Sequence, residues 1–286
     1  MGRLRHLFRY CEDQFTFVLP FFAHDPFKSY YTALTDSDLR NYMRHLFIAL
    51  AHLHDNGVMH RDVKPNNFLY NRKEGKYLLV DFGLAQDDAS RQKRGRTPKA
   101  ASISALGQTR PPVAGGTPRL ALPGFGTARR LSSHAGTPPV RMVNVSRAGT
   151  RGFRAPEVLL RSVQQTVAID VWSAGIILLS ILSGRYPFFQ APEDMSALVE
   201  MSCVFGSKPL IALADSLDRC LELPDEHAPM ELASLCRQLR GTGPPGDGRP
   251  VISDSAYDLL VACLTLNPSS RMSAKDALQH EYLRQP

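Results

Sequence analysis

Residues 58–83 hold polar side chains whose types and spacing could bind a hard cation. Residues 60–62 read His-Arg-Asp, Asn67 follows five positions after this aspartate, and residues 81–83 read Asp-Phe-Gly. Carboxylate and amide oxygens suit Mg²⁺, which keeps several of its waters and takes only one or two ligands from the protein. A stretch rich in Asp, Asn and Pro can also be an ordinary loop. Two such tripeptides in this order, with the apolar residues 77–80 between them, favour a functional site.

The order H-R-D-x-K-x-x-N followed by D-F-G resembles the phosphoryl-transfer signature of protein kinases. The resemblance implies that Asp62 accepts or orients the proton of an attacking hydroxyl group, and that Lys64 reaches the phosphoryl group being transferred. It also implies that Asn67 and Asp81 bind Mg²⁺, which neutralises charge on the phosphates. ATP and Mg²⁺ are therefore the expected cofactors.

The elements that must position these residues can be predicted from their surroundings. Residues 35–55 repeat apolar side chains at helical spacing, which predicts a helix ahead of the catalytic residues. Thr35 and Asp38 resemble a capping box at its start, and Gly57 suits its end. The apolar residues 77–80 predict a strand that leads into Asp-Phe-Gly.

A second helix is predicted at residues 168–183, which are apolar nearly all round and should lie in the centre of the domain. Asp170 near its start is costly to bury unless its oxygens accept hydrogen bonds, and in kinases such an aspartate holds the catalytic-loop backbone. Short helical patterns follow, and two more helices are expected around residues 267–268. The resemblance implies that Arg271 binds Glu157 of an Ala-Pro-Glu tripeptide.

Composition limits the classes of protein to consider. The length of 286 residues fits one large domain or two small ones. Five cysteines, an odd number with no C-x-x-C pair, favour a reducing compartment and argue against a disulfide framework or a zinc site. The first ten residues lack the apolar core of a secretory signal, and the longest apolar run is too short to span a bilayer, so no membrane association is expected.

The net charge of +7 is unevenly distributed along the chain. Residues 87–149 contain eleven Lys or Arg and two Asp, which leaves 23 basic and 25 acidic residues in the remainder. The basicity therefore belongs to one segment, and the folded parts are nearly neutral. A broad surface for direct nucleic-acid binding is not predicted.

Residues 87–147 are rich in Gly, Pro, Ser, Thr and Arg, and we expect them to form a disordered basic insert. Residues 91–96 (RQKRGR) are consistent with a nuclear-localisation patch and equally with a solvated basic loop. Thr97, Thr117 and Thr137 each precede a proline. They could be phosphorylation sites, or chance products of a proline-rich composition.

The details narrow the resemblance to kinases of the cell division cycle 7 type, the catalytic subunits of a kinase that licenses replication origins. The stretches concerned include HRDVKPNNFLYN, YLLVDFGLAQ, AGTRGFRAPEVLL, AIDVWSAGIILLSILSGRYPF and YDLLVACLTLNPSSRMSAKDAL. The resemblance covers residues 3–86 and 148–284. A long insert between Asp-Phe-Gly and Ala-Pro-Glu is common in this family.

The resemblance implies an α+β kinase fold, here mainly the helical C-terminal lobe with a remnant of the N-terminal lobe. Residues 1–22 would form the remnant hairpin and hinge, with strands at 3–10 and 15–21. Residues 23–86 and 148–286 would form the C-terminal lobe on either side of the insert.

Membership of this family would imply a serine/threonine kinase located in the nucleus. Its expected partners are a Dbf-type regulatory subunit and, as substrates, subunits of the replicative helicase. The family prefers Ser or Thr followed by acidic or phosphorylated residues, and Arg151 and Arg154 would suit that preference electrostatically.

Further site residues follow from the resemblance alone. Thr150 resembles the kinase threonine that bonds the catalytic aspartate and lysine. In the hinge, the backbone of Pro20 and Phe22 would pair with adenine, and Leu19 would be the gatekeeper. Leu69 would lie beneath the adenine ring.

The sequence also departs from the kinase pattern. About 15 residues precede the hinge, and they contain no Gly-rich loop, no strand lysine and no partner glutamate. We therefore expect a truncated chain with little activity alone. One alternative is a kinase-like binding module without catalysis, although Asp62, Asn67 and Asp81 are all present. Another long-insert kinase, of the cyclin-dependent or casein-kinase sort, fits the sequence less well.

Overall fold

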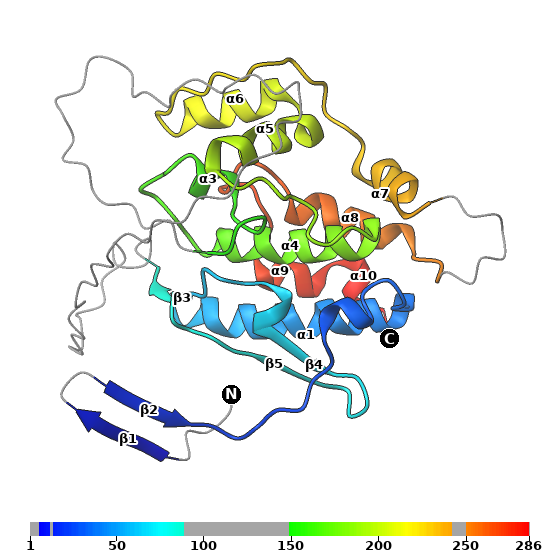
Figure 1. Cartoon of the computed structure of the whole chain (residues 1–286). Coiled ribbons are helices and arrows are strands. Elements are labelled where there is room, and N and C mark those ends of the chain that lie inside the picture. Colours follow the sequence, from blue (N-terminus) through cyan, green and yellow to red (C-terminus); the bar gives the residue numbers. More distant parts are fainter. Residues whose placement is uncertain (1–5, 12–13, 89–148, 242–249, 286) are drawn as a thin grey trace, which may run out of the picture.

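A computed structural model describes residues 6–11, 14–88, 149–241 and 250–285. These residues form a mainly helical body with three small two-stranded sheets, in agreement with the expected α+β kinase fold (Figure 1). Of the predicted insert, only its first two residues are described. The basic patch and the three Thr-Pro sites lie outside the described residues.

Helix α1 (Asp36–Asp55) leads to the catalytic residues and confirms the helix predicted there. Its first turn is closed by a capping box, in which Thr35 Oγ1 accepts from Asp38 N and Asp38 Oδ2 accepts from Thr35 N, both at 3.1 Å. One face of α1 is buried, and it consists of Leu39, Tyr42, Met43, Leu46, Phe47, Leu50, Ala51 and Leu53. Apolar burial on that face fixes the helix against the core.

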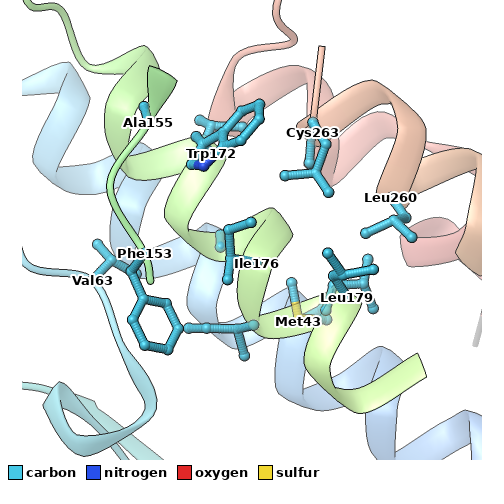
Figure 2. Packing of buried hydrophobic residues seen from close by; sticks show 14 of the residues in the cluster. Met43, Val63, Phe153, Ala155, Trp172, Ile176, Leu179, Leu260 and Cys263 are labelled. Atoms are coloured by element: carbon cyan, nitrogen blue, oxygen red, sulfur yellow. The ribbon is translucent and has the colours of Figure 1, made fainter. Parts of the chain in front are cut away.

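Helix α4 (Ala168–Ser183) is the centre of the domain, as predicted, because all sixteen of its residues are buried. It contacts α1, α7 and α8, and in Figure 1 it lies between α1 and α8. In Figure 2, Trp172, Ile176 and Leu179 of α4 lie among side chains from α1 and α8. The helix ends at Gly184, which has a left-handed φ of 69°.

Three antiparallel strand pairs complete the fold. Strand β1 (His6–Cys11) pairs with β2 (Gln14–Val18), which confirms the predicted hairpin, although each strand reaches one residue further towards the turn and β2 ends at Val18. Strand β4 (Phe68–Asn71) pairs with β5 (Lys76–Leu79), so the strand expected before Asp-Phe-Gly begins one residue earlier. The third pair joins β3 (Val58–Met59) to β6 (Gln86–Asp87). This third pair brings the two ends of the catalytic region together.

The other helices are short. They are η1 (Phe27–Ser29), η2 (Pro65–Asn67), α3 (Pro156–Leu159), α5 (Asp194–Phe205), α6 (Ser207–Ser216), α7 (Leu232–Arg240), α8 (Asp254–Cys263), α9 (Ala274–Gln279) and α10 (Glu281–Arg284).

The two helices expected around residues 267–268 are three helices in the structure. The extended backbone of His280 divides α9 from α10, and its Nδ1 accepts from Tyr282 N at 3.2 Å to begin the new turn. Among the described helices, none combines the length and the apolar character that crossing a membrane requires.

Candidate active site

The carboxylate of Asp62 is the centre of a hydrogen-bonded group. Lys64 Nζ lies 2.7 Å from Asp62 Oδ2. Thr150 donates to Asp62 Oδ1 from its backbone N at 2.8 Å and from its Oγ1 at 2.7 Å. Lys64 Nζ also donates to Thr150 Oγ1 at 2.7 Å. The predicted contacts among these three residues are present, although Thr150 is 88 positions away from Asp62 in the sequence.

Asn67 belongs to the same group through its amide nitrogen. Nδ2 donates to the backbone oxygen of Asp62 at 2.9 Å and to its Oδ2 at 3.0 Å. Because both donations fix the amide group, the carbonyl Oδ1 is directed away from Asp62. A neutral oxygen of this kind suits Mg²⁺.

Asp81 follows a strand end that is bonded to the catalytic loop. The backbone N of Val80 donates to Asn67 O at 2.8 Å, and Val80 O lies 3.0 Å from His60 Nε2. The Asp81 carboxylate is exposed, and Gly83 N donates to its Oδ1 at 3.3 Å. In the described part of the chain, no group of three or more His, Cys, Asp or Glu could hold a metal. Asn67 and Asp81 carry the amide and carboxylate oxygens that Mg²⁺ prefers, and their binding of the ion stays a prediction.

The charge of Asp62 is set by two opposing effects. Burial raises the pKa of its carboxyl group, and hydrogen bonds from Lys64 and Thr150 lower it further than burial raises it. The net effect holds the pKa of Asp62 below its usual value. The carboxylate is therefore ionised at neutral pH and can accept a hydrogen bond from a hydroxyl group.

The backbone that carries Asp62 is held by the central helix. Asp170 of α4 is fully buried, and its carboxylate accepts from the backbone N of His60 and of Arg61, each at 2.8 Å. His54 Nε2 lies 3.0 Å from the same carboxylate. The hydrogen bonds predicted for this buried aspartate are thus present, and they join the site to the core.

A second predicted pair closes the region behind the site. Arg271 Nη1 and Nη2 donate to Glu157 Oε1 and Oε2 at 2.7 and 3.0 Å, and both side chains are buried. The guanidinium group also lies over the ring of Trp172, 5.0 Å from its centroid. This confirms the predicted pairing of Arg271 with the Ala-Pro-Glu segment.

The two arginines expected to bind acidic substrate residues differ in the structure. Arg151 is exposed. Arg154 donates from Nε to Gly149 O at 2.9 Å and pairs through Nη1 with Asp194 Oδ1 at 3.0 Å. Arg154 therefore already has an acidic partner within the protein, and the binding of acidic substrate residues by Arg151 or Arg154 stays a prediction. Sequence reasoning did not identify Asp194, because it starts a helix 40 positions away.

The expected adenine contacts lie on two segments. Leu19 is 58% exposed, Pro20 and Phe22 are half-buried, and the backbone O of Phe22 lies 3.0 Å from His24 Nδ1. Leu69 is half-buried in β4. Neither of the two hollows beside residues 149–154 is lined by these four nucleotide candidates. Their role in binding adenine stays a prediction.

Comparisons with known proteins place this geometry in a family. The family model of the protein kinase domain matches residues 3–103 and 116–283. The probable cell division control protein 7 homolog 1 of Encephalitozoon cuniculi is 36% identical over 95% of this chain and 72% of its own length.

Two longer relatives agree. A non-specific serine/threonine protein kinase of Drosophila melanogaster is 32% identical over 94% of this chain and 57% of its own length. The cell cycle serine/threonine-protein kinase hsk1 of Schizosaccharomyces pombe is 33% identical over 95% of this chain and 53% of its own length. The chain therefore belongs to the protein kinase family, among the serine/threonine kinases of the cell division cycle 7 type.

Proposed function

We propose that this chain carries the catalytic residues for transfer of the γ-phosphoryl group of Mg·ATP to a protein serine or threonine. The observation that supports this most directly is the Asp62 carboxylate, which is held at both oxygens by Lys64 and Thr150. Asp62 orients the acceptor hydroxyl group, and Lys64 offers a positive charge at the phosphoryl group being transferred. Positioning and charge stabilisation supply most of the rate in this chemistry.

Asn67 Oδ1 and the Asp81 carboxylate are the proposed ligands of Mg²⁺. Their support is the fixed amide of Asn67 and the exposed carboxylate of Asp81, on backbone joined by the Val80–Asn67 hydrogen bond. The bound ion would supply positive charge to the phosphate oxygens. Leu19, Pro20, Phe22 and Leu69 would contact the adenine base.

The proposed substrates are replication-initiation proteins, in particular subunits of the replicative helicase, and the proposed partner is a Dbf-type regulatory subunit in the nucleus. The names of the relatives, which refer to cell division control and the cell cycle, support this assignment. The exposed Arg151 supports recognition of acidic or phosphorylated residues beside the acceptor.

The test separates nucleotide binding from phosphoryl transfer. The chain is prepared with a Dbf-type subunit, and transfer of labelled phosphate to a helicase-subunit peptide is measured. Asp62→Asn should lower turnover by about 10²- to 10⁴-fold, since it removes the proton acceptor, and should leave Mg²⁺-dependent ATP binding unchanged. Asp81→Asn should weaken that binding instead.

Asp87→Asn is the matched control, because Asp87 is an exposed aspartate in β6 close to both positions in sequence. It should alter neither measurement. Equal transfer by the wild type and Asp62→Asn would contradict the proposed role of Asp62. A third outcome would favour the non-catalytic binding module: the wild type binds ATP with Mg²⁺ but transfers no phosphate, and Asp81→Asn loses the binding.

A further inference from the structure

Gly149 lies where the chain returns to the catalytic loop, directly before Thr150. Its φ is +103°, a value that residues with a side chain rarely adopt. A Cβ atom built on Gly149 would lie 2.8 Å from the backbone oxygen of Arg61. Both the backbone conformation and the space around it therefore require glycine at this position.

The Arg61 oxygen that a side chain on Gly149 would meet has little freedom to move. Arg61 has a left-handed φ of 69°, and its backbone N donates to the buried Asp170 Oδ1 at 2.8 Å. Its guanidinium group donates to Gln86 Oε1 at 2.6 Å and to Gln165 Oε1 at 3.2 Å. An added methyl group on Gly149 would thus displace Gly149 itself, because the neighbouring atom is fixed backbone.

Gly149 is also held from the opposite direction. Its carbonyl oxygen accepts from Arg154 Nε at 2.9 Å. Arg154 is kept in place by its ion pair with Asp194 on α5, at 3.0 Å. Gly149 therefore lies between the catalytic loop and the side chain of Arg154, which α5 holds through Asp194.

We propose that Gly149 is a positioning residue, which sets the distance between the catalytic loop and the loop of residues 149–154 so that Thr150 reaches Asp62. The two hydrogen bonds from Thr150 to Asp62 Oδ1 depend on this separation. Lys64, which bonds both residues, completes the arrangement only when Thr150 is in place. The close contact of Gly149 on Arg61 O thus acts through Thr150 on the proposed catalytic group.

Gly152, at the other side of Thr150, provides a contrast. Its φ is +82°, and a Cβ there would lie 2.6 Å from Phe189 O, a different segment from the catalytic loop. Gly75, in the turn between β4 and β5, has a φ of +61°, and a Cβ added there would meet no atom within 4 Å. Gly75→Ala therefore introduces the same kind of backbone strain without any contact.

The test measures hydrogen exchange at the Thr150 amide, whose N donates to Asp62 Oδ1. Gly149→Ala should speed this exchange by about 10- to 100-fold, as expected for loss of a hydrogen bond to a charged acceptor. Gly75→Ala should leave it unchanged. Gly152→Ala should disturb the Phe189 segment and raise KM for the peptide with a smaller effect at Thr150.

Arg154→Lys provides a second test that does not depend on the folding of Gly149→Ala. The lysine keeps the charge facing Asp194 but lacks the Nε donor to Gly149 O. We expect Thr150 exchange faster than in the wild type and slower than in Gly149→Ala. The proposal is overturned if the Thr150 amide of Gly149→Ala exchanges at the wild-type rate. If Gly149→Ala does not fold, a wild-type exchange rate at Thr150 in Arg154→Lys overturns it.

A kinetic measurement adds a readout that a purely structural role would not change. In the complex with its regulatory subunit, Gly149→Ala should lower kcat by about 100-fold at an unchanged KM for ATP, because displacement of about 1 Å at a catalytic group has this effect. Equal kcat in Gly149→Ala and Gly75→Ala would also overturn the proposal. The exchange measurement requires no phosphoryl transfer, so failure of the proposed function would leave it intact.

Discussion

Two ion pairs of equal length lie in different surroundings in this molecule. Lys64 and Asp62 are 2.7 Å apart, with side chains 21% and 8% exposed. Arg271 and Glu157 are also 2.7 Å apart, with side chains 0% and 1% exposed. The separation of the charges does not distinguish the two pairs, whereas access to solvent does.

The two regions also differ in how completely their polar groups are used. Every N–H of the Arg271 guanidinium group has an acceptor, and these acceptors are Glu157 Oε1, Glu157 Oε2, Thr265 O, Leu266 O and Ala168 O. Around Asp62, the amide oxygen of Asn67 and the exposed carboxylate of Asp81 keep capacity for a ligand. A buried pair whose polar groups are all bonded is costly to break, and a site with unused polar groups can bind a substrate.

The largest effect on stability should come from breaking the buried pair. Arg271→Met leaves Glu157 without its partner inside the core, which should lower the free energy of unfolding by about 3–5 kcal/mol. The double variant Arg271→Met with Glu157→Leu should recover much of this loss, because no charge then stays buried. Chemical denaturation monitored by circular dichroism measures both.

Lys275→Met is the matched control, since Lys275 and Asp55 are also 2.7 Å apart but 64% and 48% exposed. We expect a change within about 0.5 kcal/mol, as for most exposed pairs. A loss of similar size in the two single variants would show that burial does not separate the regions as described.

A smaller effect is expected at the partly exposed pair of Lys64 and Asp62, where the pH dependence of catalysis should change. Thr150→Val removes the Oγ1 hydrogen bond to Asp62, so the pKa of Asp62 should rise towards the value that burial alone favours. The acidic limb of the kcat/KM profile should therefore move to higher pH. A profile identical to that of the wild type would mean that Thr150 does not control this carboxyl group. Thr32→Val, at an exposed position, is the control.

The same substitution has a defined effect on stability. The pKa of Asp62 is lower in the folded protein than in the unfolded chain, where it lies at about 3.9. Ionisation of Asp62 therefore stabilises the folded state at pH values above about 3.9, and this stabilisation is lost as the pH falls through the folded-state pKa. Thr150→Val should therefore destabilise the protein by about 1 kcal/mol at pH 7, with the part due to ionisation disappearing at low pH.

The last prediction compares two thiol groups of the wild type and requires no substitution; one of them, Cys263, lies beside the buried pair. Burial raises the pKa of Cys263 to about 12, although the charge of Arg271 lowers it, so the thiol should resist alkylation at pH 8. Cys203 is exposed and serves as the internal reference. Peptide mapping after brief iodoacetamide treatment should show Cys203 labelled and Cys263 protected. Rapid labelling of Cys263 in the folded wild type would show that this region is open.

Local signals allowed the main helices to be predicted. Thr35 and Asp38 form the capping box at the start of α1, and the apolar residues before Gly184 form α4. The resemblance to kinases supplied the long-range pairs, including Arg271 with Glu157 and Thr150 with Asp62. These pairs could be predicted because their residues belong to recognisable motifs.

The remainder depends on neighbours that sequence patterns do not identify. Strands β3 and β6 have two residues each, too few for a periodic signal, and they pair across the catalytic region. Arg151 and Arg154 belong to the same motif, and the sequence does not indicate that Arg154 pairs with Asp194 of α5. Helix α9 ends at His280 because the backbone there is extended, and the imidazole group of His280 then accepts the hydrogen bond that begins α10. Each of these outcomes is decided by tertiary packing.

The position of Asp170 has a consequence for how the protein unfolds on heating. This carboxylate lies at the start of the central helix and holds the backbone of His60 and Arg61. Releasing the loop would remove two hydrogen-bond donors from a carboxyl group in the protein interior, which is costly. Local opening of the loop is therefore disfavoured, and the active site and the core should melt as one cooperative unit.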